Sequence, residues 1–356
     1  MSVIGWAILV LTQPVVWVLL TVAALVQLPF TLLCSCCRER DDVGGQHVLI
    51  TGGSEGVGLE LALECVRRGA RVTLVARTLS KLEAARAQVL CTREAQTLLH
   101  NGALPDSRVC IASADVGSRE QLAAAVQRAE AALGPVDVCI AAAGAAIPKY
   151  FDELTADDFA HMLAVNYMGV VHLAQLLLPG MASRGRGHFA AISSMAAAVP
   201  FVGYAAYSPA KAACRALVDT LRNEYADVPG VRFHLAFPPD VDTPGFAREN
   251  ETKPWETSHV WPAVFNETFS ARDVARLMLD GMARGDYHLR SPDAFGNLLV
   301  SRAWGHHPRA APLLEAAVAP LFVAAHGGMC WMADRVVRKG ARHKGLAYVH
   351  GGGGGV

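Results

Sequence analysis

The chain has 356 residues, of which 32 are lysine or arginine and 32 are aspartate or glutamate. Because the formal net charge is zero, the protein has no overall field that would attract nucleic acid or another acidic polymer. The nine cysteines are an odd number and lie mostly in apolar runs. Cysteine usage therefore argues against a disulfide framework and favours a reducing compartment.

The first apolar segment covers residues 1–37 and contains no charged side chain. A single spanning helix needs only about 20 apolar residues, and a cleaved signal peptide would carry a basic residue before a shorter apolar stretch. We therefore expect a retained anchor, either transmembrane or re-entrant, because Pro14 and Pro29 can bend it. Arg38 and Arg40 follow directly, which places the rest of the chain on the cytosolic side.

A polar linker, residues 38–46, joins this anchor to the rest of the chain. Three cysteines stand at the membrane edge, and two interpretations of them are equally open: S-acylation, or small residues at the level of the headgroups. These cysteines are Cys34, Cys36 and Cys37.

A second apolar region lies within residues 291–345. It is interrupted by Glu315 and His326 and followed by basic residues that should stay on the cytosolic side. We therefore prefer a membrane-associated segment that dips into the bilayer or lies along its surface, and the alternative is a helix packed on the soluble domain. The glycine-rich end, residues 346–356, is expected to be a flexible tail.

The middle of the chain, residues 47–290, alternates short apolar runs with longer amphipathic stretches. Short runs without polar alternation are typical of strands that are buried on both faces. We predict strands at 47–51, 71–76, 108–113, 136–142, 188–193 and 231–237, and helices at 57–69, 79–99, 118–133, 156–183 and 207–227. Strict alternation of strand and helix predicts an α/β domain with a doubly wound parallel sheet of the Rossmann type.

A glycine-rich turn follows the first predicted strand and precedes the first helix. Glycine there permits a tight turn and lets backbone amides approach a pyrophosphate at the positive end of the helix. The position between an apolar strand and an amphipathic helix favours a dinucleotide site over an ordinary turn. The expected cofactor-binding residues are Gly52, Ser54, Gly56 and Gly58.

The end of the second predicted strand indicates which dinucleotide binds. An NAD site would present Asp or Glu to the adenosine ribose, whereas this chain has Ala76, followed by Arg77 and, one turn later, Lys81. Guanidinium groups bind phosphate through a bidentate fork, so this pattern favours NADPH over NADH. The alternative is an arginine that is merely solvated, which leaves the missing acid unexplained.

Tyr207 and Lys211 are separated by one helical turn, so their side chains lie on one face of a helix. An adjacent ammonium lowers the pKa of a phenol, and we expect Lys211 to hold the phenol of Tyr207 ionised near neutral pH. Pro209 is compatible with the first turn of that helix, where its missing N–H has no intrahelical partner. Ser194 ends the fifth predicted strand, at the sheet edge where such folds bind ligands.

The glycine turn, the stretch VNYMG around Asn166, Ser194 and the stretch AYSPAK stand in the order and approximate spacing of the short-chain dehydrogenase/reductase family. The chain resembles that family over about residues 45–290. The resemblance implies that Tyr207 donates a proton to a carbonyl oxygen and that Lys211 lowers its pKa and binds the nicotinamide ribose. It also implies that Ser194 orients the carbonyl and that Asn166 anchors a proton-relay water.

The same resemblance assigns more residues to the cofactor. Asp115 matches a position beside the adenine, and Val241 and Thr243 lie in the loop that holds the nicotinamide end. Gly144 ends the stretch AAAG, where the family usually has an asparagine and this chain has alanines. That departure removes a side-chain hydrogen bond near the cofactor and puts the local rigidity in doubt more than catalysis.

Residues 237–257 are very similar to the substrate loop of the 3-ketodihydrosphingosine reductase group of this family. This implies NADPH-dependent reduction of 3-oxosphinganine, a long-chain sphingoid ketone, by a domain on the cytosolic face of the endoplasmic reticulum membrane. Such a substrate resides in membrane lipid, which fits the apolar ends of the chain. The resemblance also implies a homo-oligomer paired through the helices at 156–183 and 207–227.

Two alternatives stay open: a membrane-bound retinoid or steroid ketone reductase of the same family, and a non-catalytic membrane scaffold that senses NADPH. An intact set of Ser194, Tyr207, Lys211 and Asn166 argues against the scaffold. No metal site is predicted, because His306 and His307 have no cysteine or acidic partner at a suitable spacing.

Overall fold

The computed structural model describes residues 41–100, 108–259, 267–293 and 296–297, together with the single residues 328, 331 and 335. These ranges contain most of the predicted domain, residues 47–290. The predicted anchor, nearly all of the C-terminal membrane-associated region, the histidine pair at 306–307 and the tail lie outside the described residues.

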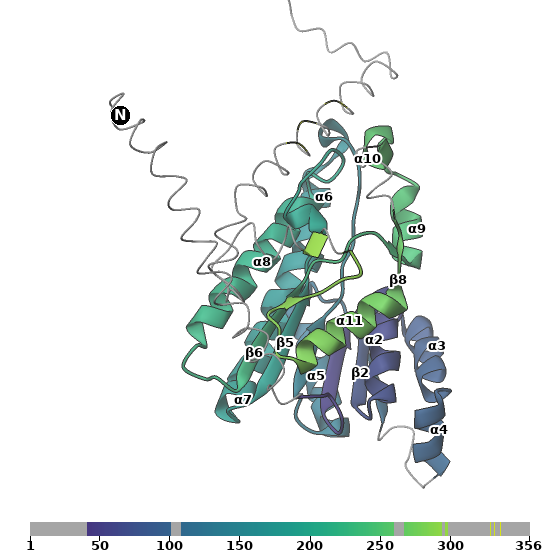
Figure 1. The fold of residues 1–356 in the computed structure, drawn as a ribbon, viewed down its shortest axis with the longest axis vertical. Coiled ribbons are helices and arrows are strands. Elements are labelled where there is room, and N and C mark those ends of the chain that lie inside the picture. Colours follow the sequence, from purple (N-terminus) through teal and green to yellow (C-terminus); the bar gives the residue numbers. More distant parts are fainter. Residues whose placement is uncertain are drawn as a thin grey trace, which may run out of the picture.

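A seven-stranded sheet forms the centre of the domain (Figure 1). All of its neighbouring strands are parallel, in the order β3-β2-β1-β4-β5-β6-β9. The direction of winding therefore reverses between β1 and β4, which confirms the doubly wound α/β fold. The strands are β1 (His47–Thr51), β2 (Arg71–Ala76), β3 (Val109–Ser113), β4 (Val138–Ala141), β5 (Gly187–Ile192), β6 (Val231–Ala236) and β9 (His288–Leu289).

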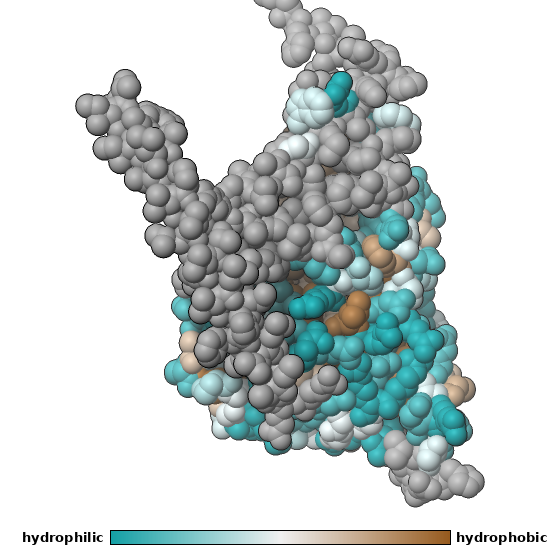
Figure 2. Space-filling view, viewed as in Figure 1, coloured by the Kyte–Doolittle hydropathy of each residue, from teal (hydrophilic) through white to brown (hydrophobic). Residues whose placement is uncertain are grey.

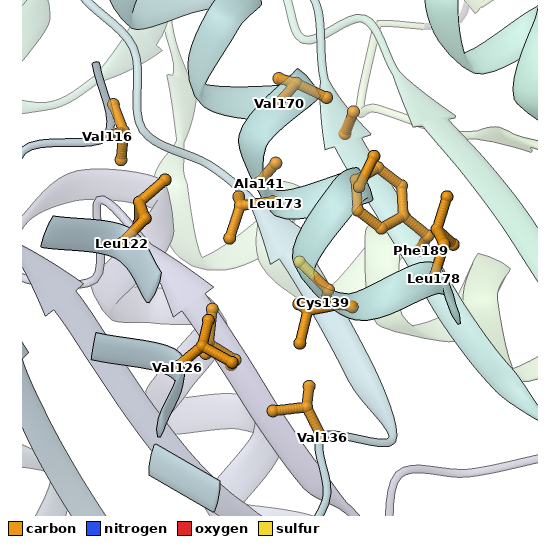
Figure 3. Packing of buried hydrophobic residues seen from close by; sticks show 14 of the residues in the cluster. Val116, Leu122, Val126, Val136, Cys139, Ala141, Val170, Leu173, Leu178 and Phe189 are labelled. Carbon is orange, nitrogen blue, oxygen red and sulfur yellow. The ribbon is translucent and has the colours of Figure 1, made fainter. Parts of the chain in front are cut away.

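Helices cover both faces of the sheet. One core contains side chains of α5 (Arg119–Leu133), α7 (Gly169–Ser183) and α8 (Tyr207–Glu224). The other contains side chains of α2 (Gly56–Arg67), α3 (Leu79–Leu90) and α11 (Ala271–Ala283). In the first core, side chains of α5 and α7 meet sheet residues such as Cys139 and Phe189 (Figure 3). The described surface over α11 and α3 is mostly hydrophilic, as expected of a solvated outer layer (Figure 2).

The six predicted strands are confirmed, and their observed ends lie within two residues of the predicted ones. β1 and β4 are buried along their whole length, because the two helical layers cover both of their faces. This is the reason why an uninterrupted apolar run was a reliable signal for these strands.

The single helix predicted at 79–99 is wrong, because two helices occupy this stretch: α3 and α4 (Arg93–His100). Thr92 separates them: its hydroxyl and its N–H both donate to the carbonyl of Val89, at 2.9 and 3.2 Å. The carbonyl of Thr92 then accepts the first bond of the next helix, from Gln96 N at 2.9 Å. A threonine that bonds back to the preceding turn thus ends one helix and begins another.

The helix predicted at 156–183 is present as α6 (Ala156–Leu163), the π-helical segment η3 (Ala164–Met168) and α7. Thr155 begins it with a capping box, in which its hydroxyl and the side chain of Asp158 each bond to the other residue's backbone N–H. Among the described residues this is the one helix long and apolar enough to cross a membrane, but half of its most apolar window is buried inside the domain. It is therefore a core helix.

The sequence analysis missed several elements at the carboxyl edge of the sheet. The substrate loop forms β7 (Val241–Asp242), α9 (Pro244–Asn250) and α10 (Trp255–His259), and β7 pairs with β8 (Phe269–Ser270). Helix α11 was also missed, although Ser270 caps it by accepting from Asp273 N. Two short 3₁₀ turns complete the edge, η2 (Phe151–Glu153) and η4 (Met195–Ala197).

Candidate active site

A cleft of about 490 Å³ opens at the carboxyl edge of the sheet, beside the point where the winding reverses. Folds of this class bind their ligands there. Eleven of the predicted site residues line it: Gly52, Ser54, Gly56, Gly58, Arg77, Lys81, Asp115, Gly144, Tyr207, Lys211 and Thr243. The structure thus brings together residues that are as far apart in the chain as the glycine turn and the substrate loop.

The glycine turn has a shape that only glycine allows. Gly52 and Gly56 adopt positive φ angles of 69° and 58°. A side chain on Gly52 would lie 2.8 Å from the Cα of Ala143, and one on Gly58 would lie 2.2 Å from the carbonyl oxygen of Gly52. The turn leads into the first residue of α2, so the backbone at a helix N-terminus faces the cleft, and such an end suits a pyrophosphate.

The segment after β4 is held by backbone and hydroxyl contacts in place of the usual asparagine. Ala143 N donates to the hydroxyl of Thr51 at 3.3 Å. A Cβ on Gly144 would lie 3.1 Å from Asn166 Oδ1 and 3.2 Å from Lys211 Nζ. Gly144 therefore separates these two polar groups and leaves no room for a side chain.

Tyr207, Lys211 and Ser194 meet where β5 ends and α8 begins. Ser194 and Tyr207 form a side-chain hydrogen bond, and Ser194 Oγ also accepts from Ala196 N at 3.1 Å. Lys211 is buried; its Nζ donates to the carbonyl of Ile192 at 2.8 Å and lies 5.8 Å from the centre of the Tyr207 ring. The three side chains are thus adjacent, as the predicted roles require.

The expected lowering of the Tyr207 pKa is wrong for this structure. Burial raises the pKa of the phenol, and the hydrogen bond with Ser194 offsets only part of that increase. Burial also lowers the pKa of Lys211, whose ammonium points to the Ile192 carbonyl. Spacing of one helical turn suggested a charge effect, but removal of the phenol from water dominates. The phenol of Tyr207 therefore keeps its proton at neutral pH in this structure.

Asn166 lies in the π-helical segment η3 and is buried. Its Nδ2 donates to the carbonyls of Ala145 (2.9 Å) and Met162 (3.1 Å), and its Oδ1 accepts from Ala145 N at 3.2 Å. Both amide hydrogens therefore donate to backbone carbonyls. Oδ1 can accept one more hydrogen bond, on the side of Gly144 and Lys211. The amide fixes the loop after β4 against η3.

Of the two predicted residues in the substrate loop, Thr243 lines the cleft and Val241 does not. Thr243 caps α9 by accepting from Phe246 N at 3.1 Å, and its methyl group lies 3.1 Å from where a Cβ on Gly56 would be. Val241 is buried in β7, where it pairs with Phe269, and it is not among the described residues that line the cleft. Thr243 therefore contacts the glycine turn, whereas Val241 supports the loop from behind.

Charged residues of the site that sequence reasoning missed come mainly from the substrate loop. Arg248 of α9 lines the cleft and pairs with Glu55 of the glycine turn. Glu249 accepts a hydrogen bond from the hydroxyl of Tyr204, whose ring lies 5.5 Å from that of Tyr207. A charged residue inside the glycine turn was the available signal for Glu55, but its partner is 193 residues away.

A model of the short chain dehydrogenase family matches residues 46–254. The chain belongs to the short-chain dehydrogenase/reductase family. It is 35% identical over 250 residues to a 3-dehydrosphinganine reductase of Danio rerio, covering 69% of this chain and 70% of that protein. It is 36% identical over 270 residues to a 3-ketodihydrosphingosine reductase of Mus musculus, covering 74% and 76%.

A solved structure of the same fold is that of a short-chain dehydrogenase/reductase from Burkholderia phymatum in complex with NAD. It has a TM-score of 0.60 and 24% sequence identity, and the match covers 73% of this chain and 94% of that one. A nicotinamide dinucleotide fits the residues of this family member's own cleft: positive-φ glycines, a helix N-terminus, and the cations Arg77 and Lys81.

Proposed function

We propose that this family member is an NADPH-dependent reductase that converts 3-oxosphinganine to sphinganine. The observation that carries the proposal is the position of Tyr207: it lines the dinucleotide cleft, forms a hydrogen bond with Ser194, and its ring lies 5.5 Å from that of Tyr204, which lines an apolar groove. The two relatives described above are named 3-dehydrosphinganine reductase and 3-ketodihydrosphingosine reductase, and no contact among the described residues favours a retinoid or a steroid.

In the proposed reaction, a nicotinamide cofactor supplies the hydride that adds to the carbonyl carbon. Ser194 hydrogen-bonds to the ketone and orients it, and Tyr207 gives its hydroxyl proton to the carbonyl oxygen. This transfer neutralises the negative charge that hydride addition would otherwise leave on the carbonyl oxygen. Lys211, which is tied to β5 by the Ile192 carbonyl and the Ser193 hydroxyl, fixes the start of α8 and so positions the phenol.

An apolar groove of about 330 Å³ supports a substrate with a hydrocarbon chain. It lies beside the catalytic tyrosine, because Tyr204 lines the groove and contacts the Tyr207 ring. Phe151, Phe201 and Pro209 form more of its wall, and Phe151 is 73% exposed. A wall of this kind stabilises methylene groups, at about 0.8 kcal/mol for each one removed from water.

Carboxylates near the phenol favour an amino ketone over a neutral steroid or retinoid. Asp240 lies after β6 and directly after Pro238 and Pro239. Pro238 lines the cleft, and its carbonyl accepts a hydrogen bond from Met195 N at 3.3 Å. The charge of Asp240 raises the pKa of both Tyr204 and Tyr207, and the charge of Lys253 in turn lowers the pKa of Asp240. Asp240 is exposed at the surface; partial burial raises the pKa of its carboxyl and the charge of Lys253 lowers it, and a substrate ammonium would act in the same direction as Lys253.

We further propose that residues 1–37 anchor the protein in the endoplasmic reticulum membrane, with the domain on the cytosolic face and in contact with membrane lipid. We also propose that the subunits pair through the helix that runs from α6 to α7 and through α8. Support for the anchor comes from its uncharged sequence. A variant that lacks residues 1–37 should lose turnover of the long-chain ketone far more than turnover of a short soluble ketone. Equal losses would count against the anchor.

The test of the function is NADPH oxidation by the full chain in mixed micelles. The substrates are 3-oxosphinganine, the same ketone without its amino group, a retinal and a steroid ketone. We expect preference for 3-oxosphinganine, and we expect Asp240→Asn to reduce the preference for the amino group, whereas Asp242→Asn, on the same loop, leaves it unchanged. Faster turnover of the retinal or the steroid would overturn the proposal.

A further inference from the structure

An ion network crosses the mouth of the cleft and has no role in the proposed reaction. The carboxylate of Glu55 accepts from Lys81 Nζ at 2.7 Å and also from the guanidinium of Arg248. The three residues belong to the glycine turn, to α3 and to α9, and all three line the cleft. A single carboxylate therefore links two walls of the dinucleotide site.

Glu55 stands directly before α2, where its charge opposes the expected ligand. The N-terminus of a helix favours an anion such as a cofactor phosphate, and a carboxylate there repels it. Glu55 does not cap α2 with its side chain, which is engaged with the two cations. Burial alone would raise the pKa of this carboxyl, but the hydrogen bonds from Lys81 and Arg248 lower it, so the group is ionised at neutral pH.

The same cations are those that a 2′-phosphate needs. Lys81 follows β2 by one turn beyond Arg77, and both line the adenosine side of the cleft, where Ala76 takes the place of the acid of an NAD site. Arg77 has no ion pair with any residue that the structure describes, so it is available to a phosphate. Lys81 and Arg248, in contrast, are already paired.

We propose that Glu55 is a specificity-determining residue, which competes with the 2′-phosphate of NADPH for Lys81 and Arg248. The inference rests on the proposed use of NADPH. Binding exchanges one anion for another: the carboxylate releases both cations and turns to solvent, and the phosphate takes its place. Glu55 thus lowers the affinity for NADPH more than the affinity for NADH, which carries no 2′-phosphate.

Exposure makes this exchange inexpensive. The side chains of Glu55, Lys81 and Arg248 are 29%, 51% and 56% exposed, so water solvates the ions after the pairs break. Exposed pairs of this kind contribute little net stability. A phosphate dianion carries more charge and more acceptor oxygens than a carboxylate, so it displaces Glu55 while the carboxylate still reduces the net gain.

The experiment measures the dissociation constants of NADPH and NADH by nicotinamide fluorescence, without a ketone, for the wild-type chain, Glu55→Gln and Arg248→Gln. We expect Glu55→Gln to bind NADPH about fivefold to tenfold more tightly at low salt, with the NADH constant changed much less; tenfold corresponds to about 1.4 kcal/mol. We expect Arg248→Gln to weaken NADPH binding. The gain in Glu55→Gln should shrink at about 1 M salt, where the Debye length is about 3 Å.

Glu83→Gln is the matched control. It removes the same charge as Glu55→Gln, but Glu83 is exposed on the helix that carries Lys81 and does not line the cleft. It should leave both constants unchanged. If Glu55→Gln binds NADPH no more tightly than the wild-type chain does, the inference is overturned, and Glu55 only holds α3 and α9 together. If the dissociation constants of NADPH and NADH shift equally, Glu55 does not determine cofactor specificity. If the wild-type chain binds neither dinucleotide, the proposed function itself is refuted.

Discussion

A Gly144→Ala substitution should lower turnover strongly while it lowers the melting temperature only modestly. In Gly144→Ala the new Cβ would lie 3.1 Å from Asn166 Oδ1 and 3.2 Å from Lys211 Nζ, both closer than ordinary contacts of a methyl group. Asn166 cannot yield easily, because three hydrogen bonds fix its amide. Lys211 Nζ has one described hydrogen bond, to Ile192, so the lysine is the group that must move.

The size of the effect follows from these contacts. Overpacking of a well-filled site costs about 1–3 kcal/mol. For a domain of this size each kcal/mol lowers Tm by roughly 2–4 °C, so we expect a decrease of about 2–12 °C. Displacement of catalytic groups by about 1 Å costs on the order of 100-fold in rate, so turnover should fall by about that factor while the protein stays folded.

The assay compares Tm and the turnover of 3-oxosphinganine for wild type, Gly144→Ala and Gly245→Ala. Gly245 lines the same cleft, but a Cβ there would lie 3.7 Å from Thr243 Oγ1, which is an ordinary contact. Gly245→Ala should therefore keep both the Tm and the activity. If Gly144→Ala matches wild type in both measurements, the crowding argument and the placement of Lys211 are refuted.

Two further predictions concern stability and substrate selection. Burial lowers the pKa of His234 to about 3, so between about pH 6.5 and 3 the unfolded chain binds more protons than the folded chain. The free energy of unfolding therefore decreases as the pH is lowered through this range, by about 1.4 kcal/mol per pH unit. Urea unfolding at pH 7.5 and 5.5 should show this loss, which His234→Gln reduces; identical midpoints would contradict it. Phe151→Ser should lower kcat/KM severalfold for the long-chain ketone but not for a short one, whereas Leu163→Ser, exposed on α6, should change neither.

Strands and cofactor motifs could be predicted because their signals are local. The apolar runs at β1 and β4 reflect burial on both faces, and glycines with positive φ reflect the turn that only they can make. Strand β9 could not be found in this way. It has two residues, His288 and Leu289, and only their pairing with β6 makes them a strand.

The electrostatics of the site could not be predicted from spacing. The relation of Tyr207 to Lys211 suggested a lowered pKa, but the cost of burying the phenol depends on the surrounding fold. The pairing of Glu55 with Arg248 joins residues 193 positions apart, so no local pattern announces it. The structure therefore brings Tyr207, Lys211 and Ser194 together as expected, whereas the charge state of Tyr207 differs from the one that the spacing suggested.

The central claim is that Tyr207 donates the proton to the ketone, and its most direct test is the Tyr207→Phe variant. We expect NADPH oxidation with 3-oxosphinganine to fall by about 100- to 10,000-fold, with the dissociation constant of NADPH unchanged. A phenylalanine variant that still reduces the ketone at a rate near that of wild type would contradict the account.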